Sequence, residues 1–127
     1  MATLMLDTHV VAWLYAGKIE KFPARAQARI DADFLAVSPM VTLELQYLHE
    51  IGRLRATGDA VVDDLRKRVG LRVSDTSLDR VIAAAFSLSW TRDPFDRIIA
   101  AHCLVEQTPL LTADGAIREH LPLALWD

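Results

Sequence analysis

Cysteine is almost absent from this chain, and Cys103 is its only example. A single thiol cannot form an internal disulfide or supply a cysteine-built zinc site. No apolar run approaches the ~20 residues that a membrane-spanning helix needs. The first apolar stretch follows no basic segment and is interrupted by Asp7, unlike a secretory signal. These absences predict a cytoplasmic protein with no membrane partner, and Cys103 is expected in its core.

Lysine is also scarce, and Lys18, Lys21 and Lys67 are the only ones. Lys plus Arg total 14 against 17 Asp plus Glu, and the net charge of -3 is not that of a simple nucleic-acid-binding protein. Nucleic acid is still compatible with this balance if the acids gather around a metal. The basic residues between 53 and 72 are expected to form a solvated helix surface rather than a phosphate-binding site.

Short apolar runs alternate with helical patterns along the 127 residues. Strands are predicted over 3–6, 35–38, 71–74 and 110–112, with a fifth at a sheet edge over 123–126. Helices are predicted over 8–16, 24–32, 40–51, 60–69, 78–88 and 94–106, with Asp59 capping the fourth and a short helical turn after Asp114.

This alternation predicts an α/β fold with three layers, in which helices cover both faces of a four- to five-stranded, mainly parallel sheet. Helices outnumber strands, so the helices around Glu44 and Asp63 are expected to pack on each other beside the sheet. No repeat or interdomain linker is visible, and residues 1–127 are predicted to form a single domain.

Four carboxylates stand where a purely structural role is hard to explain. Asp7 and Asp114 each follow a short apolar run, whereas Glu44 and Asp96 lie on apolar helices. Ligands of open parallel sheets bind beyond the carboxyl ends of the strands. Two charges ~4 Å apart in such a place would repel by about 4 kcal/mol at an effective dielectric of ~20. A divalent cation would remove this cost, so a metal site is the first hypothesis.

Each acid also has an ordinary structural explanation. Asp7 is a good helix N-cap before Thr8, and for this residue alone the two explanations are equally balanced. Asp114 fits turn chemistry. Asp93, followed by Pro94 and then Asp96, is an ordinary helix start.

Glu44 is harder to explain in this way. The positions three and four residues away on its helix hold no lysine or arginine. A carboxylate on an apolar stripe needs a partner from elsewhere, and a metal or a distant side chain such as Arg97 would serve. The four histidines form no metal-binding motif, and His9 and His102 are expected on the surface or in packing.

Taken together, the motifs resemble a family of nucleases. The segments that carry the resemblance are Leu4–His9, Thr42–Leu45, Arg92–Ala101 and Leu110–Asp114. In order and spacing they resemble the PIN-domain ribonucleases, specifically the VapC-type toxins of toxin–antitoxin pairs, over essentially the whole chain.

The resemblance implies a PIN-like fold and an acidic cluster of Asp7, Glu44, Asp96 and Asp114 that holds Mg²⁺ or Mn²⁺, with Asp93 as a further acid. It also implies hydrolysis of RNA phosphodiester bonds, a homodimer, and a cognate antitoxin whose segment blocks the pocket. Thr8 and Thr112 correspond to hydroxyl residues near that pocket.

Other function classes remain open at this point. A haloacid-dehalogenase-like phosphatase would have a second aspartate where this chain has His9, and it would need a late lysine that is absent. The stronger alternative is a degenerate, non-catalytic PIN fold that acts as an RNA- or protein-binding module.

Overall fold

The computed structural model describes residues 2–127 as an α/β fold. Its strands are β1 (Thr3–Leu6), β2 (Phe34–Val37), β3 (Arg72–Val73), β4 (Leu110–Leu111) and β5 (Ala124–Leu125). Its helices are α1 (Thr8–Ala16), α2 (Ala24–Ala32), α3 (Pro39–Glu50), α4 (Gly58–Val69), α5 (Leu78–Ala85), α6 (Pro94–Glu106) and α7 (Gly115–His120), with a short 3₁₀ helix, η1 (Ile19–Lys21).

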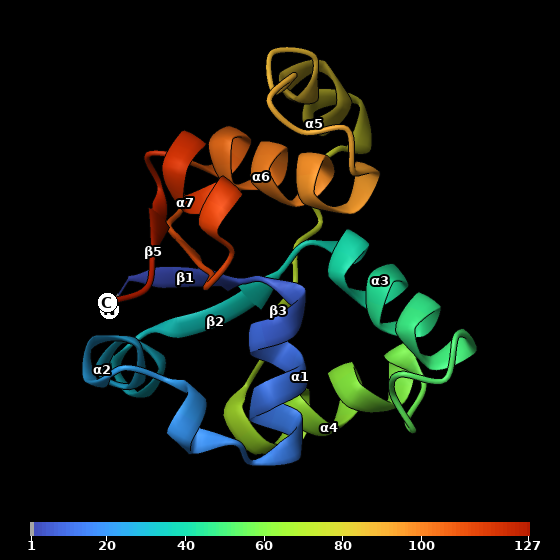
Figure 1. The fold of residues 1–127 in the computed structure, drawn as a ribbon, viewed down its shortest axis with the longest axis vertical. Coiled ribbons are helices and arrows are strands. Elements are labelled where there is room, and N and C mark those ends of the chain that lie inside the picture. The colour runs from blue at the N-terminus through green and yellow to red at the C-terminus, as the bar shows by residue number, and fades with distance from the viewer. Residues whose placement is uncertain (1) are drawn as a thin grey trace.

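All five strands are parallel, and their order across the sheet is β3-β2-β1-β4-β5. Helices α1, α2 and α4 lie on one side of the sheet and α5, α6 and α7 on the other, with α3 at the boundary (Figure 1). The three-layer parallel fold predicted from the sequence is therefore confirmed. The order reverses between β1 and β4, and their carboxyl ends are where such a fold binds ligands.

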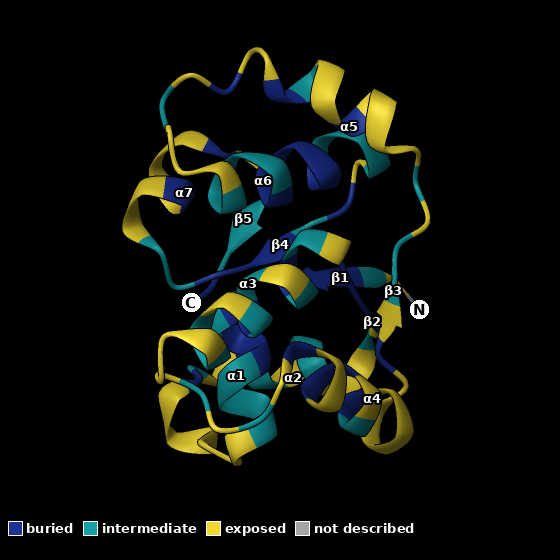
Figure 2. Cartoon of the chain, turned by 90° about the vertical axis from the view of Figure 1, so that its right-hand side faces the viewer, coloured by how far each residue is buried: buried dark blue, intermediate teal, exposed yellow. Residues whose placement is uncertain are grey.

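The sheet is buried according to strand position. β1, β2 and β4 are almost wholly buried, whereas the edge strands β3 and β5 are partly open (Figure 2). Cys103 lies in the core, as expected, with its Sγ 3.7 Å from Sδ of Met5. Within residues 2–127, no helix has the length and apolarity that crossing a bilayer requires.

Helices α3 and α4 pack on each other, as predicted. Gly58 allows their close approach, because a Cβ there would stand 2.4 Å from the carbonyl oxygen of Thr42. The charged end of α4 forms exposed ion pairs, such as Lys67–Asp63 and Arg68–Asp64, and is a solvated surface as expected.

Two local predictions are wrong, and one element was missed. Helix α4 begins two residues earlier than predicted, because Thr57 rather than Asp59 is its N-cap and accepts a hydrogen bond from the amide of Ala60 at 3.2 Å. Helix α5 ends at Ala85 instead of residue 88. At this end the side chain of Arg97 from α6 donates hydrogen bonds to the carbonyls of Ala85 and Phe86. The 3₁₀ turn η1 was not predicted.

Candidate functional site

Asp7 is fixed at the point where the strand order reverses. It follows β1 directly and is only 3% exposed. The amide of Thr8 donates to its Oδ1 at 2.8 Å, and the Thr112 hydroxyl donates to its Oδ2 at 2.7 Å. Since Thr112 follows β4, Asp7 joins the ends of the two central strands. The capping role of Asp7 and its place in a cluster of acids are therefore compatible.

His9 strengthens this junction. Its Nε2 accepts a hydrogen bond from the amide of Ala113 at 2.9 Å, and its Nδ1 lies 3.6 Å from Oδ2 of Asp7. Its ring packs on Trp13 and Trp126 at centroid distances of 4.9 and 6.4 Å. The expected packing role is confirmed, but the contact with Ala113 also makes His9 a link between α1 and the end of β4.

Glu44 lies on α3 and turns toward the same place. Its Oε1 accepts a hydrogen bond from the Thr8 hydroxyl at 2.5 Å. The structural alternative for Glu44, a pair with Arg97, is wrong, because Arg97 donates to the carbonyls of Ala85 and Phe86 at 2.9 and 3.4 Å. Glu44 thus has one neutral hydrogen-bond donor and no cation beside it in the part of the chain that is described.

The remaining acids lie at helix starts. Asp93 is the N-cap of α6, and its Oδ1 accepts from the amides of Phe95 and Asp96 at 2.8 and 3.3 Å. Asp114 caps α7 by accepting from the amide of Ile117 at 2.9 Å. The helix-start and turn explanations for Asp93 and Asp114 are therefore correct in geometry. Asp96 occupies the first turn of α6, where the N-terminal end of the helix dipole favours a negative charge.

All five acids share one electrostatic environment. Burial, together with the charges of Asp7, Asp93, Asp114 and Glu44, raises the pKa of Asp96 to about 7. Burial also raises the pKa of Glu44, with added repulsion from Asp7 and Asp93, and the hydrogen bond from the Thr8 hydroxyl opposes this rise. The fold therefore brings the predicted acids together with an excess of negative charge.

The chemistry of this cluster fits a hard divalent cation, because all its donors are carboxylate oxygens that repel one another, and no lysine or arginine among residues 2–127 forms an ion pair with them. As placed, however, no three His, Cys, Asp or Glu side chains within residues 2–127 are close enough to hold one ion. Asp7, Asp93 and Asp114 each accept a hydrogen bond from a backbone amide, and Glu44 accepts one from the Thr8 hydroxyl.

A second polar cluster was not foreseen from the sequence. The His102 Nε2 lies 2.9 Å from Oγ of Ser74 and 3.2 Å from Oε2 of Glu106, and the Thr76 hydroxyl donates to Glu106 at 2.8 Å. Ser74 and Glu106 both contact Nε2 of His102. In a hydrolase triad the carboxylate instead binds the ring nitrogen opposite the serine and orients the imidazole, so this cluster is not such a triad. The cluster fastens the segment after β3 onto α6.

Apo stability should reveal the electrostatic cost of Asp96. Because the folded-state pKa of about 7 is above the ordinary pKa of 3.8, the native protein binds a proton that the unfolded chain lacks between these values. Stability without metal should fall as pH rises through this window. Asp96→Asn should remove this contribution, so its stabilising effect relative to wild type should be larger at pH 8 than at pH 5.

Urea unfolding in EDTA at both pH values measures this difference. Exposed Asp31 on α2 provides the control, and Asp31→Asn should shift stability by the same small amount at both pH values. An Asp96→Asn effect independent of pH would mean that Asp96 is ionised without cost.

Comparisons with known proteins agree with this geometry. The family model described as PIN domain matches residues 4–120. Ribonuclease VapC22 of Mycobacterium tuberculosis is 31% identical over 131 residues, which cover 99% of this chain and 100% of that protein. The chain belongs to the PIN-domain family. Its predicted resemblance to VapC-type members is thereby confirmed.

Solved structures extend the similarity of this PIN domain to its fold. VapBC2 from Rickettsia felis, bound to a promoter DNA fragment, matches with a TM-score of 0.69 and 19% identity, covering 98% of this chain and 99% of that one. DNA-bound VapBC from Salmonella typhimurium matches with a TM-score of 0.66 and 21% identity, covering 98% and 96%. At these identities the match supports the PIN-like fold.

Proposed function

We propose that this protein is a metal-dependent ribonuclease, the toxin of a toxin–antitoxin pair. The observation that carries the proposal is the convergence of five acids where the strand order of a PIN domain reverses. The whole-length similarity to a protein named a ribonuclease supports the reaction class.

In this proposal Asp7, Glu44, Asp96 and Asp114 hold Mg²⁺ or Mn²⁺, and Asp93 lies in or next to the same ligand set. When bound, a divalent cation supplies Lewis-acid polarisation of a phosphate and neutralises charge that develops on its oxygens. Hydrogen bonds within the chain hold the carboxylates in the positions from which they would bind this cation. The hydroxyls of Thr8 and Thr112 orient Glu44 and Asp7, and His9 fixes the turn after β4.

The proposed reaction is hydrolysis of an RNA phosphodiester that leaves a 5′-phosphate and a 3′-hydroxyl. Incubating end-labelled single-stranded RNA with the purified protein and Mg²⁺, then mapping the ends of the fragments, tests this. Fragments with 2′,3′-cyclic phosphates would contradict the proposal, because they arise when the RNA's own 2′-hydroxyl attacks.

The degenerate, non-catalytic PIN fold is the alternative, and a single domain is proposed in either case. The retained acids favour catalysis, since a binding module has no need for mutually repelling carboxylates in one place. Calorimetric titration with Mg²⁺ separates the two functions. Binding that Asp7→Asn abolishes supports the enzyme, and no binding by wild type supports the module.

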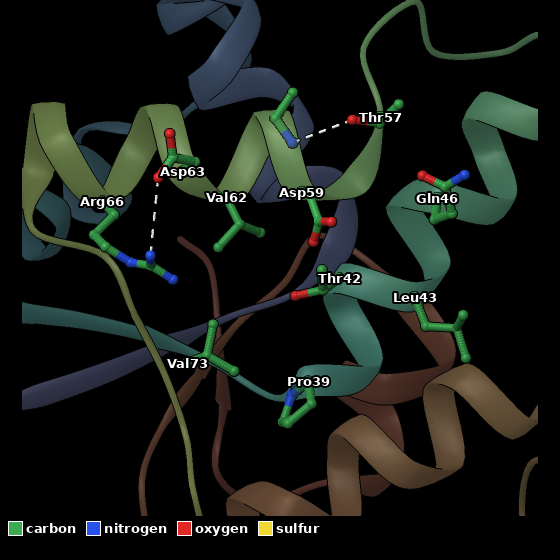
Figure 3. Close-up of a pocket in the computed structure, with 11 residues that line it drawn as sticks. Pro39, Thr42, Leu43, Gln46, Thr57, Asp59, Val62, Asp63, Arg66 and Val73 are labelled. Carbon is green, nitrogen blue, oxygen red and sulfur yellow. Dashed lines mark hydrogen bonds and ion pairs between the residues drawn. The ribbon is translucent and has the colours of Figure 1, made fainter.

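An antitoxin segment is the proposed inhibitor, and the groove between α3 and α4 is its proposed seat. This cavity of about 950 Å³ combines apolar Leu43 and Val62 with acidic Asp59 and Asp63, of which Asp63 is paired with Arg66 (Figure 3). The Thr42 hydroxyl is buried without a hydrogen-bond partner among the described residues. An amphipathic helix with basic residues would complement this lining. Glu44 lies on a different face of α3, so a further stretch of the antitoxin would be needed to reach the acid site.

A homodimer is proposed through the apolar face of α5. Leu78, Ile82 and Phe86 are spaced four residues apart and exposed, with Leu78 67% open. Leu78 and Ile82 also line an apolar cavity of about 480 Å³ between α3, α5 and α6. These exposed side chains and this cavity lie on the same surface. A twofold axis could therefore place the exposed side chains of each copy in the cavity of the other.

Leu78→Glu should weaken this dimer at least about tenfold, because it would bury an unpaired charge at the centre of the contact. Sedimentation equilibrium measures the change. Val69→Glu on α4 introduces the same charge at an apolar residue that is 44% exposed elsewhere, and it should leave association unchanged. A Leu78→Glu protein as dimeric as wild type would place the interface on another face.

A further inference from the structure

Two arginines from different helices meet at one residue near the acid site. On α7, the Arg118 Nη2 lies 2.6 Å from Oδ1 of Asp127. On α2, the Arg25 Nη1 donates to the backbone carbonyl of Asp127 at 2.8 Å. Guanidinium groups are well suited to bind oxyanions, carboxylate and phosphate alike. The arrangement is therefore an anion-binding site that a carboxylate of the chain already fills.

A cavity of about 460 Å³ opens at this place, and its lining includes Arg25, Gly115, Arg118, Glu119, Trp126 and Asp127. With Asp127 in position, two positive and two negative side chains cancel. If the Asp127 side chain turns away, the cavity becomes net positive. That side chain is 66% exposed, and an ion pair in water of this kind is weak enough to exchange for another anion.

The cavity lies one helical turn from the acids. Arg118 is four residues after Asp114, and its amide donates to the Asp114 carbonyl at 3.0 Å. One turn of helix is about 5.4 Å. Gly115, which lines the cavity, directly follows Asp114. A strand of RNA whose reacting phosphate lies at the acids can thus present a neighbouring phosphate to these arginines.

We propose that Arg25 and Arg118 bind a backbone phosphate of single-stranded RNA beside the scissile one, and that this phosphate displaces Asp127. The inference rests on the ribonuclease function proposed above. The arginines are positioning residues that compensate, outside the acid cluster, for its repulsion of the RNA backbone. Asp127 competes with the substrate for them and tunes its affinity.

The two partners of the Arg118–Asp127 pair should have opposite effects on RNA binding. Arg118→Gln should weaken binding about tenfold and lower the salt dependence of log affinity by ~0.7, the value for one phosphate on a single strand. Asp127→Asn should strengthen binding, because it frees the guanidinium. If the pair served only to hold Asp127 against α7, both variants would lose the same contact and leave RNA affinity unchanged.

Fluorescence anisotropy of a labelled single-stranded RNA measures binding over a series of salt concentrations, with Ca²⁺ in place of Mg²⁺ so that the charge of the acid cluster is compensated. Arg68→Gln and Asp64→Asn are matched controls, since they break a pair of the same type and distance, 2.6 Å, on α4 with the same charge changes. Each control should change affinity less than twofold. Steady-state cleavage by Arg118→Gln should show a raised KM with kcat retained.

The results separate this inference from the proposed function. Cleavage by wild type with RNA affinity equal in Arg118→Gln and Arg68→Gln would overturn the inference alone. Opposite effects of Arg118→Gln and Asp127→Asn on binding by a protein that never cleaves RNA would support phosphate binding by the arginines and overturn the ribonuclease function.

Discussion

Asp96→Asn is expected to reduce RNA cleavage by at least about a hundredfold while the fold survives. Removal of one preorganised electrostatic contact in an active site typically costs 10²–10³ in kcat, roughly 2.7–4 kcal/mol. Asp96 is the acid whose pKa is raised to about 7 by burial and by its four neighbours, so it lies where their fields overlap. Asparagine keeps its size and removes the charge.

The outcome distinguishes a ligand from a helix-start residue. If Asp96 served only the first turn of α6, asparagine would lower stability by ~0.3–1 kcal/mol through the helix dipole and leave activity intact. If it serves the site, activity falls and stability without metal rises. Circular dichroism with urea unfolding gives the stability, and labelled RNA gives the rate. Asp31→Asn should cleave like wild type, and full cleavage by Asp96→Asn would remove Asp96 from the proposed site.

The sequence predicted the fold well because its signals are local. Apolar runs such as Leu4–Leu6, with no polar alternation, indicate strands buried on both faces, and β1 is such a strand. Gly17 marks the end of α1 with a φ of 71°, a conformation that glycine adopts at little cost. Apolar runs and helix-ending residues of this kind predict strands and helix ends without any knowledge of distant contacts.

The site was partly predictable for the same reason. Glu44 attracted attention because its own helix offers no cation, which is a local observation. Its actual donor, the Thr8 hydroxyl, lies 36 residues away and follows from the way α1 and α3 pack. Pairing Glu44 with Arg97 failed because the end of α5 presents carbonyls to that arginine. Local spacing does not encode such competition between distant partners.

Individual hydrogen bonds between residues far apart in the chain lay beyond sequence reasoning. His9 and Ala113 are 104 residues apart, and Arg25 and Asp127 are 102 apart. Each of these contacts depends on how several helices and strands are placed relative to one another. His9 follows a helix cap and Arg25 lies on a polar helix, and neither position distinguishes the residue in the sequence. This is why the clustering of the acids could be predicted from the sequence, whereas the contacts of His9, Arg25 and Arg118 could not.

Removing divalent metal should abolish cleavage, and restoring Mg²⁺ or Mn²⁺ should recover it. The acid cluster repels an RNA phosphate as long as its charge is uncompensated, so EDTA should leave no measurable activity. Metal should also stabilise the fold, by about 2.7 kcal/mol at a concentration 100 times the dissociation constant. Thermal unfolding over a Mg²⁺ series measures this effect independently of any RNA.

The pH dependence of that stabilisation ties the metal to Asp96. Since the pKa of Asp96 is about 7, a proton occupies it increasingly as pH falls from 8 to 6, and the cation must displace this proton to bind. The Mg²⁺ concentration for half-maximal stabilisation should therefore rise as pH falls, and in Asp96→Asn it should be high at both pH values. Asp31→Asn should behave as wild type. Two results would mean that the converging carboxylates do not bind a catalytic metal. One is full activity in a rigorously metal-free preparation, and the other is the same stabilisation by Mg²⁺ in Asp96→Asn as in wild type.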